Sequence, residues 1–195
     1  MNSFSFFLRC IFPLLIILTT PILGQSQIVA LPKECKFKVA DDMSWASPSF
    51  NDNSWESRLL GTSRQDTSGK RDLFVWYRIK VIVPSSLKKP GELGKGLRLN
   101  LGKIDDVDFT FFNGKLVGQT GSLPPEYISK FQADRVYNIP LDIVEWDKEN
   151  VIAVRVFSPD PWVGMYEGPY KLGPLQWSDS IAVEQSITQT QNSSF

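Results

Sequence analysis

Histidine is absent from the 195 residues, and cysteine occurs twice. Without histidine the chain has no Ser-His-Asp triad, no Cys-His dyad and no histidine-ligated zinc. Acid–base chemistry would have to come from carboxylates, lysine or tyrosine. Cys10 lies in an apolar N-terminal run, so only Cys35 remains in the rest of the chain, which excludes a framework of intrachain disulfides. We expect Cys35 to be a small buried hydrophobe.

An excess of charge of either sign is also lacking, because 21 basic residues balance 21 acidic ones. Proteins that bind nucleic acid, or that are held electrostatically on a membrane, carry a surplus of basic residues. We therefore expect neither kind of partner.

No apolar run is long enough to predict an integral membrane span, which needs about 20 residues. The longest, from Cys10 to Leu18, is interrupted by Pro13, follows a single basic residue and leads to the small residue Gly24. This pattern is typical of a secretory signal peptide over residues 1–24, and an uncleaved anchor is the alternative. We expect a secreted protein, periplasmic or extracellular.

Glycine, proline, asparagine and aspartate separate short apolar stretches, and no long segment keeps a period of 3.6 residues. This pattern predicts an all-β domain. Strands are expected over 74–83, 97–101, 107–112, 115–118, 135–139 and 151–157, with a last one after Gly168. The apolar segment 151–157 should be buried on both faces. Residues 141–146 are read as a helical turn or irregular, and 159–168 as a loop.

The clearest local signal is the dipeptide Asn113-Gly114 between two strands. A type I′ hairpin turn needs positive φ at both central positions, which Asn-Gly tolerates. We divide the chain into a lead-in over 25–35, a β-sandwich over 36–177 and a polar tail over 178–195 that we expect to be disordered.

Seven elements in order resemble the sugar-binding jelly-roll domain of glycoside hydrolase family 2, and are similar to β-galactosidase jelly-roll and sialate O-acetylesterase-associated modules. The resemblance implies a jelly-roll β-sandwich of the galactose-binding-like type. The matching segments are residues 36–55, Trp76-Tyr77-Arg78, 101–108, 113–118, 135–140, 149–156 and Gly168-Pro169.

By this resemblance, we expect a non-catalytic carbohydrate-binding module associated with glycoside hydrolases. Two alternatives stay open: an accessory domain that docks on a separate glycosidase without sugar affinity, and a β-galactosidase-like glycosidase. In the family the catalytic carboxylates lie in a separate barrel of about 250 residues, for which this sequence has no room. The segment 158–164 also departs from the glycine-rich stretch that the family often has there.

Trp162, Tyr166, Asp160 and Glu167 have the composition of a sugar site, because aromatic faces stack on sugar rings while carboxylates bind the hydroxyls. Trp76 is a further candidate. The alternative is that Trp162 covers the sandwich core. Trp45, Phe50 and Trp55 are interpreted as one packing element.

The aspartates are interpreted as structural. Asp105 and Asp106 are adjacent and should point to opposite faces of a strand, so a glycosidase-like pair is not expected. We expect Asp105, Asp106 and Asp108 to cap the strand and to pair with Arg78, Lys103 or Arg155.

A second group of aspartates is a candidate for a structural Ca²⁺ site, because Ca²⁺ prefers hard oxygen ligands. Its members are Asp41, Asp42 and Asp52. The alternative is that these side chains form Asx turns and surface ion pairs. No other cofactor is expected.

Overall fold

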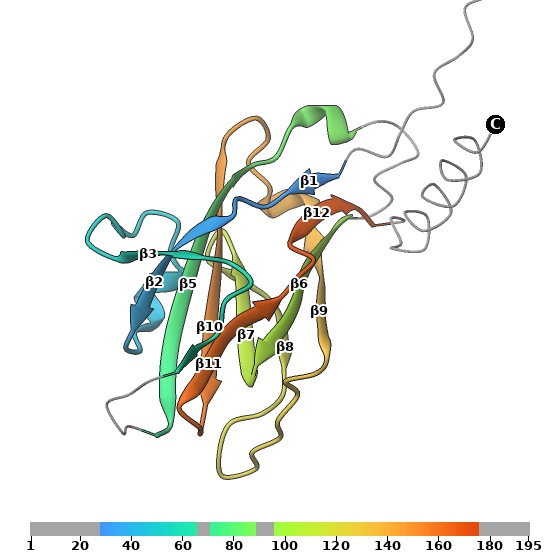
Figure 1. Cartoon of the computed structure of the whole chain (residues 1–195). Helices are drawn as coiled ribbons and strands as arrows, with labels where there is room; N and C mark the ends of the chain where they lie inside the picture. The colour runs from blue at the N-terminus through green and yellow to red at the C-terminus, as the bar shows by residue number, and fades with distance from the viewer. Residues whose placement is uncertain (1–27, 66–70, 89–95, 176–195) are drawn as a thin grey trace, which may run out of the picture.

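The protein is an all-β sandwich of two antiparallel sheets, as predicted (Figure 1). The computed structural model describes residues 28–65, 71–88 and 96–175. The predicted signal peptide and polar tail lie outside the described residues. Within the described part, no helix has both the length and the apolar character needed to cross a membrane.

The first sheet is built around β6, which has neighbours on both edges. Its strands are β1 (Val29–Ala30), β12 (Lys171–Pro174), β6 (Gly96–Asp105), β11 (Trp162–Glu167) and β4 (Arg64–Gln65), with β9 (Asp134–Pro140) beside β6. The second sheet has the order β3 (Glu56–Leu59), β2 (Glu34–Val39), β5 (Leu73–Ile82), β10 (Glu149–Ser158), β7 (Val107–Phe112) and β8 (Lys115–Thr120). The described part of the chain also contains the short 3₁₀ helices η1 (Met43–Ala46), η2 (Ser85–Lys88) and η3 (Leu141–Ile143).

The main core lies between the two sheets, where β5, β6 and β10 contribute their inward apolar side chains. β10 pairs with β5 along its whole length. Alternate residues of β10, Ile152, Val154 and Val156, face this core, while Ala153 packs into a second cluster on the opposite face. The nearly unbroken apolar character of residues 151–157 is therefore explained by burial on both sides, as expected.

The Asn113-Gly114 hairpin between β7 and β8 is confirmed. The φ angles are +47° at Asn113 and +82° at Gly114. The Asn113 side chain also ties the turn to the neighbouring chain: its Nδ2 donates to the Ile143 carbonyl at 2.9 Å, and its Oδ1 accepts from the Val151 N–H at 2.8 Å.

The second aromatic cluster covers the outer face of the second sheet. Trp45, Phe50 and Trp55 lie on one excursion of the chain and pack on Trp76, as predicted for a single packing element. Arg78 holds this excursion in place: its guanidinium is buried, and its Nε donates to Asp52 at 2.8 Å.

The remaining contacts of Arg78 are with main-chain carbonyl oxygens of the same excursion. It donates to the carbonyls of Trp45, Ser47 and Phe50. Cys35 is buried, as expected, and burial raises the pKa of its thiol to about 12.

Several elements differ from the sequence-based expectation. Residues 159–168, predicted to be a loop, contain strand β11, which pairs with β6 and β4. Glycine and proline on both sides hide its pattern, and the pairing register shifts between Met165 and Glu167. β6 also continues to Asp105, beyond the predicted end at 101. Strand β1 lies within the expected lead-in segment and joins the first sheet.

Candidate functional site

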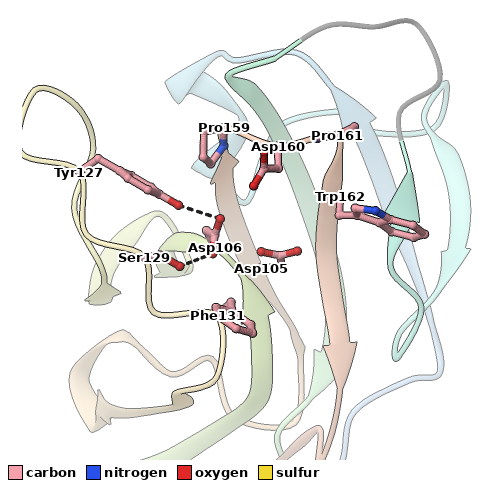
Figure 2. Close-up of a pocket in the computed structure, with 9 residues that line it drawn as sticks. All are labelled: Asp105, Asp106, Tyr127, Ser129, Phe131, Pro159, Asp160, Pro161 and Trp162. Carbon is pink, nitrogen blue, oxygen red and sulfur yellow. Dashed lines mark hydrogen bonds between the residues drawn. The ribbon is translucent and has the colours of Figure 1, made fainter.

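A cleft of about 580 Å³ lies where the chain crosses repeatedly between the two sheets. Three connections form its walls: β6 to β7, β8 to β9, and β10 to β11, each linking a strand of one sheet with a strand of the other. Figure 2 shows the carboxyl groups of Asp105, Asp106 and Asp160 between Tyr127 and Trp162. The lining residues are Asp105, Asp106, Tyr127, Ser129, Phe131, Pro159, Asp160, Pro161 and Trp162.

A smaller hollow of about 270 Å³ adjoins the cleft and shares Asp105, Phe131 and Trp162 with it. Ser63 and Tyr166 complete its lining. Trp162 is 48% exposed and Phe131 is 46% exposed, so both rings present a large apolar surface to solvent. The Tyr166 hydroxyl donates to the Phe131 carbonyl at 2.6 Å, which joins β11 to the opposite wall. Together the two hollows form one groove with aromatic side chains along it.

Asp106 holds one wall of the cleft together. Its Oδ2 accepts a hydrogen bond from the Tyr127 hydroxyl at 2.8 Å, and its Oδ1 accepts one from the Ser129 hydroxyl at 2.5 Å (Figure 2). The residue is 5% exposed. Since both carboxylate oxygens receive donors from the β8–β9 connection, Asp106 fixes the position of that connection.

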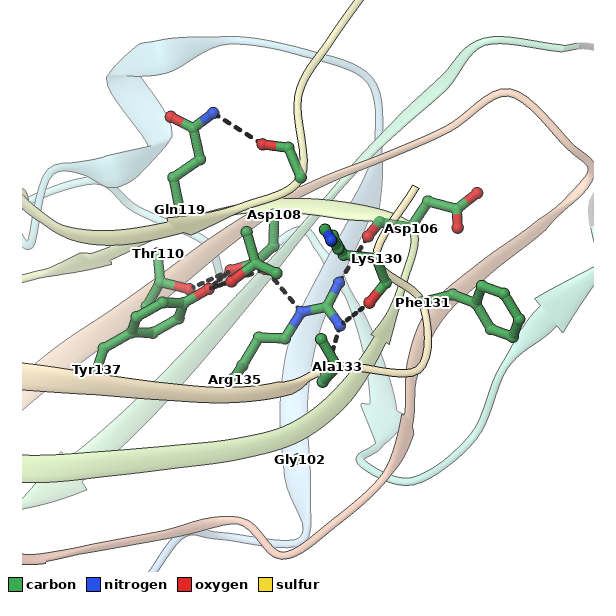
Figure 3. A network of polar contacts seen from close by, with 12 residues as sticks. Gly102, Asp106, Asp108, Thr110, Gln119, Lys130, Phe131, Ala133, Arg135 and Tyr137 are labelled. Atoms are coloured by element: carbon green, nitrogen blue, oxygen red, sulfur yellow. Dashed lines mark hydrogen bonds and ion pairs between the residues drawn. The ribbon is translucent and has the colours of Figure 1, made fainter. Parts of the chain in front are cut away.

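A buried network behind the cleft supports the same wall (Figure 3). The Arg135 Nε lies 2.9 Å from Asp108 Oδ1, and both side chains are inaccessible to solvent. The Thr110 and Tyr137 hydroxyls also donate to the Asp108 carboxylate, at 2.8 to 3.0 Å. Burial raises the pKa of Asp108, while the guanidinium and the two hydroxyls counteract this shift.

The other nitrogens of Arg135 bind the main chain of the cleft walls. Nη1 donates to the carbonyls of Lys130 and Ala133, and Nη2 donates to the carbonyl of Asp106 at 2.6 Å. Arg135 thus connects the β6–β7 and β8–β9 connections. A planar guanidinium with five N–H groups suits this arrangement, whereas lysine would lack the fixed fork.

Asp105 is the carboxyl with the most perturbed acidity in the cleft. Burial, followed by the negative charge of Asp106, raises its pKa to about 7. Asp160 contributes in the same direction, and Arg135 opposes it. A carboxyl with this pKa changes its charge near neutral pH.

The structure brings together several of the predicted sugar-site residues. Trp162 and Asp160 line the cleft, and Tyr166 lines the adjoining hollow. Glu167 lies at the end of β11, where its carboxylate pairs with Lys103 at 2.6 Å, outside both linings. Trp76 is fully buried in the second aromatic cluster, so its candidacy as a sugar contact was wrong.

Two expectations about the aspartates are also corrected. Asp105 and Asp106 line the same cleft, because Asp106 lies in the bend between β6 and β7, where strand alternation does not apply. The expected pairing is wrong as well, since the partner of Asp108 is Arg135. Arg78 pairs with Asp52, Lys103 with Glu167, and Arg155 with Asp41.

The aspartates proposed as Ca²⁺ ligands are held by separate partners. Asp41 accepts from Arg155 and Trp76, which lowers the pKa of this carboxyl, mainly through Arg155. Asp42 caps η1 by accepting from the Ser44 N–H at 2.8 Å, and Asp52 binds Arg78. Over residues 28–65, 71–88 and 96–175, no three acidic or cysteine side chains are grouped in a way that could hold a metal ion.

Sequence reasoning missed Tyr127, Ser129, Phe131 and Arg135. The first three were read only as part of a proline-containing loop, and Arg135 only as the start of a strand. No local motif marks them, because each acts through a partner more than twenty residues away, such as Asp106 or Asp108.

Comparison with known proteins gives structural neighbours without close sequence relatives. No family model matches the chain, and no curated protein is similar to it in sequence. Among solved structures, β-glucuronidase 2 of Bacteroides uniformis superposes with a TM-score of 0.61 at 21% identity over 77% of this chain. A glycosyl hydrolase family 2 member of Bacteroides cellulosilyticus superposes with a TM-score of 0.58 at 18% identity over 74% of this chain.

A β-glucuronidase of Ruminococcus gnavus gives a TM-score of 0.51 at 14% identity over 71% of this chain. The matched regions are 18%, 20% and 23% of these three enzymes. The chain thus spans about a fifth of the length of the solved proteins that it resembles. At this level of identity the likeness concerns the fold: the protein has the β-sandwich fold found in part of these glycoside hydrolases.

Proposed function

We propose that the protein is a secreted, non-catalytic carbohydrate-binding module that works beside glycoside hydrolases. The observation that carries this proposal is the groove lined by the exposed rings of Trp162 and Phe131 next to the carboxyls of Asp105 and Asp160. An exposed indole offers a flat apolar face for the C–H surface of a sugar ring, and carboxyl oxygens accept hydrogen bonds from sugar hydroxyls. The sandwich shared with segments of larger glycoside hydrolases supports a carbohydrate-associated role.

The adjacent pair of Asp105 and Asp106 is poorly suited to glycoside hydrolysis. A glycosidase needs a proton-donating carboxyl and a second carboxylate free to act as nucleophile or to activate water. Asp105, with its pKa near 7, has the acidity of a proton donor. Asp106, its neighbour, is almost inaccessible and accepts hydrogen bonds at both oxygens. It is therefore poorly placed to attack a sugar.

The test is glycan binding by the protein purified after expression of the full sequence. We expect saturable binding to at least one plant or host glycan on an array, confirmed by calorimetry. Trp162→Ala should abolish it, and Trp162→Phe, which keeps a ring, should retain part of it. Leu116→Ala removes another exposed apolar side chain, outside the groove lining, and serves as the control.

Absence of binding to every glycan, from protein shown to be folded by circular dichroism, would reject the binding module and favour the docking domain. Hydrolysis of aryl glycosides that Asp105→Asn abolishes would reject the non-catalytic assignment. The proposed secretion has its own test: mass spectrometry of the purified protein should find Gln25 at the N-terminus.

A further inference from the structure

The charge of the groove indicates which sugars it would accept. Three carboxyls, of Asp105, Asp106 and Asp160, line the cleft, and no lysine or arginine does so among residues 28–65, 71–88 and 96–175. The adjoining hollow adds Ser63 and Tyr166, which are uncharged at neutral pH, and no cation from the same described ranges. A bound anion would therefore meet negative charge on several sides and find no positive partner in the lining.

Three basic side chains pair with residues in or close to the groove without lining it. Arg71 lies at the rim, with its Nη1 3.9 Å from Asp160 Oδ1, and both side chains are more than two-thirds exposed to solvent. Arg135 is inaccessible and donates to Asp108 and to main-chain carbonyls. Lys103 is paired with Glu167. None of the three lines the groove, although Arg71 and Arg135 offset part of the negative charge of Asp160 and Asp105.

We infer that the groove selects uncharged sugars and rejects uronic acids, an inference that rests on the proposed function. Trp162 and Phe131 would supply the stacking surface, and Asp105 and Asp160 would supply the charge that excludes a carboxylate on the sugar. Like charges brought together in a binding site oppose association strongly, and this discriminates between otherwise similar ligands. The preference is opposite to the glucuronide specificity that the names of the β-glucuronidases imply for those enzymes.

The experiment uses pairs of oligosaccharides with the same backbone that differ only in oxidation at C6: cello-oligosaccharides of several lengths, each with its C6-oxidised form. Affinity is measured by calorimetry with the purified protein at pH 8, where the Asp105 carboxyl is ionised. We expect the neutral member of a pair to bind at least about tenfold more tightly than its uronate at low salt. High salt should narrow the gap, because it screens exposed charges.

Two variants test whether the cleft carboxyls cause the preference for the neutral sugar. Asp105→Asn and Asp160→Asn should each raise the affinity for the uronate several-fold relative to the neutral member. Glu149→Gln is the matched control, because Glu149 begins β10 and the cleft lies beyond the other end of that strand. It should leave the ratio unchanged.

The possible failures are distinguishable. Uronates that bind as tightly as their neutral partners, or a ratio that neither aspartate variant moves, would overturn the selectivity and leave the binding module intact. Loss of binding to both members of every pair would instead overturn the proposed function, and the selectivity with it.

Discussion

Replacement of Arg135 by methionine should be among the most damaging single changes in this protein. Methionine keeps much of the side-chain volume but leaves the Asp108 carboxylate buried without its cation, and both members of the pair have no solvent exposure. Removing one partner of a buried ion pair costs about 3–5 kcal/mol of the free energy of unfolding. The carbonyls of Lys130, Ala133 and Asp106 also lose a donor, although water can reach part of this region.

A loss of about 4 kcal/mol corresponds to a fall of roughly 10 °C in the melting temperature for a domain of this size. The assay is urea denaturation followed by circular dichroism, with the melting temperature as a second readout. Arg71→Met is the matched control, because it breaks an exposed pair with Asp160 and should cost less than about 1 kcal/mol.

The pH dependence of the stability of Arg135→Met tests whether the unpaired Asp108 carboxylate causes the loss. Without Arg135, burial should raise the pKa of Asp108 further, so the native variant favours the protonated carboxyl. Its deficit relative to the wild type should then be smaller at pH 5 than at pH 8. A loss below about 1 kcal/mol at pH 8, or a deficit that does not change with pH, would refute the role given to this pair. If Arg135→Met does not fold, the double variant with Asp108→Asn should recover folding, since no buried charge is left unpaired.

Three further predictions concern other sites. Asp105→Asn should stabilise the protein at pH 8, and the gain should shrink toward pH 5: a folded-state pKa of about 7, raised from 3.8, means that stability is lost as the pH rises through 7. The full shift would be worth about 4 kcal/mol, but Asp105 is only partly buried and solvent screens its charge, so we expect about 1 kcal/mol in urea titrations. Gly118→Ala would place a Cβ 1.9 Å from the Tyr137 ring and should cost about 1–3 kcal/mol in the same titrations; an unchanged denaturation midpoint would contradict the close approach. Asn113→Gly should lower the melting temperature less than Asn113→Ala, because glycine accepts the positive φ while both changes lose the side-chain hydrogen bonds.

The parts of the fold that depend on short stretches of sequence were predictable. The Asn113-Gly114 turn follows from two adjacent residues, and the central strand β10 follows from an apolar run that has no polar face. Strand β11 was not predictable in the same way, because Gly164 and the flanking prolines weaken its pattern, and its pairing with β6 supplies what local preference does not.

The residue types of the candidate site were predictable from the sequence, but the contacts that assemble the site were not. Trp162 and Asp160 could be proposed because exposed aromatic and acidic residues suit sugars. The pairing of Asp108 with Arg135 could not be predicted, because the sequence does not distinguish Arg135 from the three basic residues that were expected as partners. The convergence of Asp105 and Asp106 in one cleft was not predictable either, because it depends on the bend that separates β6 from β7.

Four of the six tryptophans form two separate optical reporters. Trp45 contacts both Trp55 and Trp76 against the outer face of the second sheet, whereas the indole of Trp162 lies half in solvent beside the groove. Intrinsic fluorescence from the packed trio should report unfolding, and water-soluble quenchers should reach it poorly. Emission from Trp162 should be red-shifted and readily quenched, and a ligand stacked on its ring should protect it. The part of the acrylamide quenching that Trp162→Phe removes would then show occupancy of the groove without any added label.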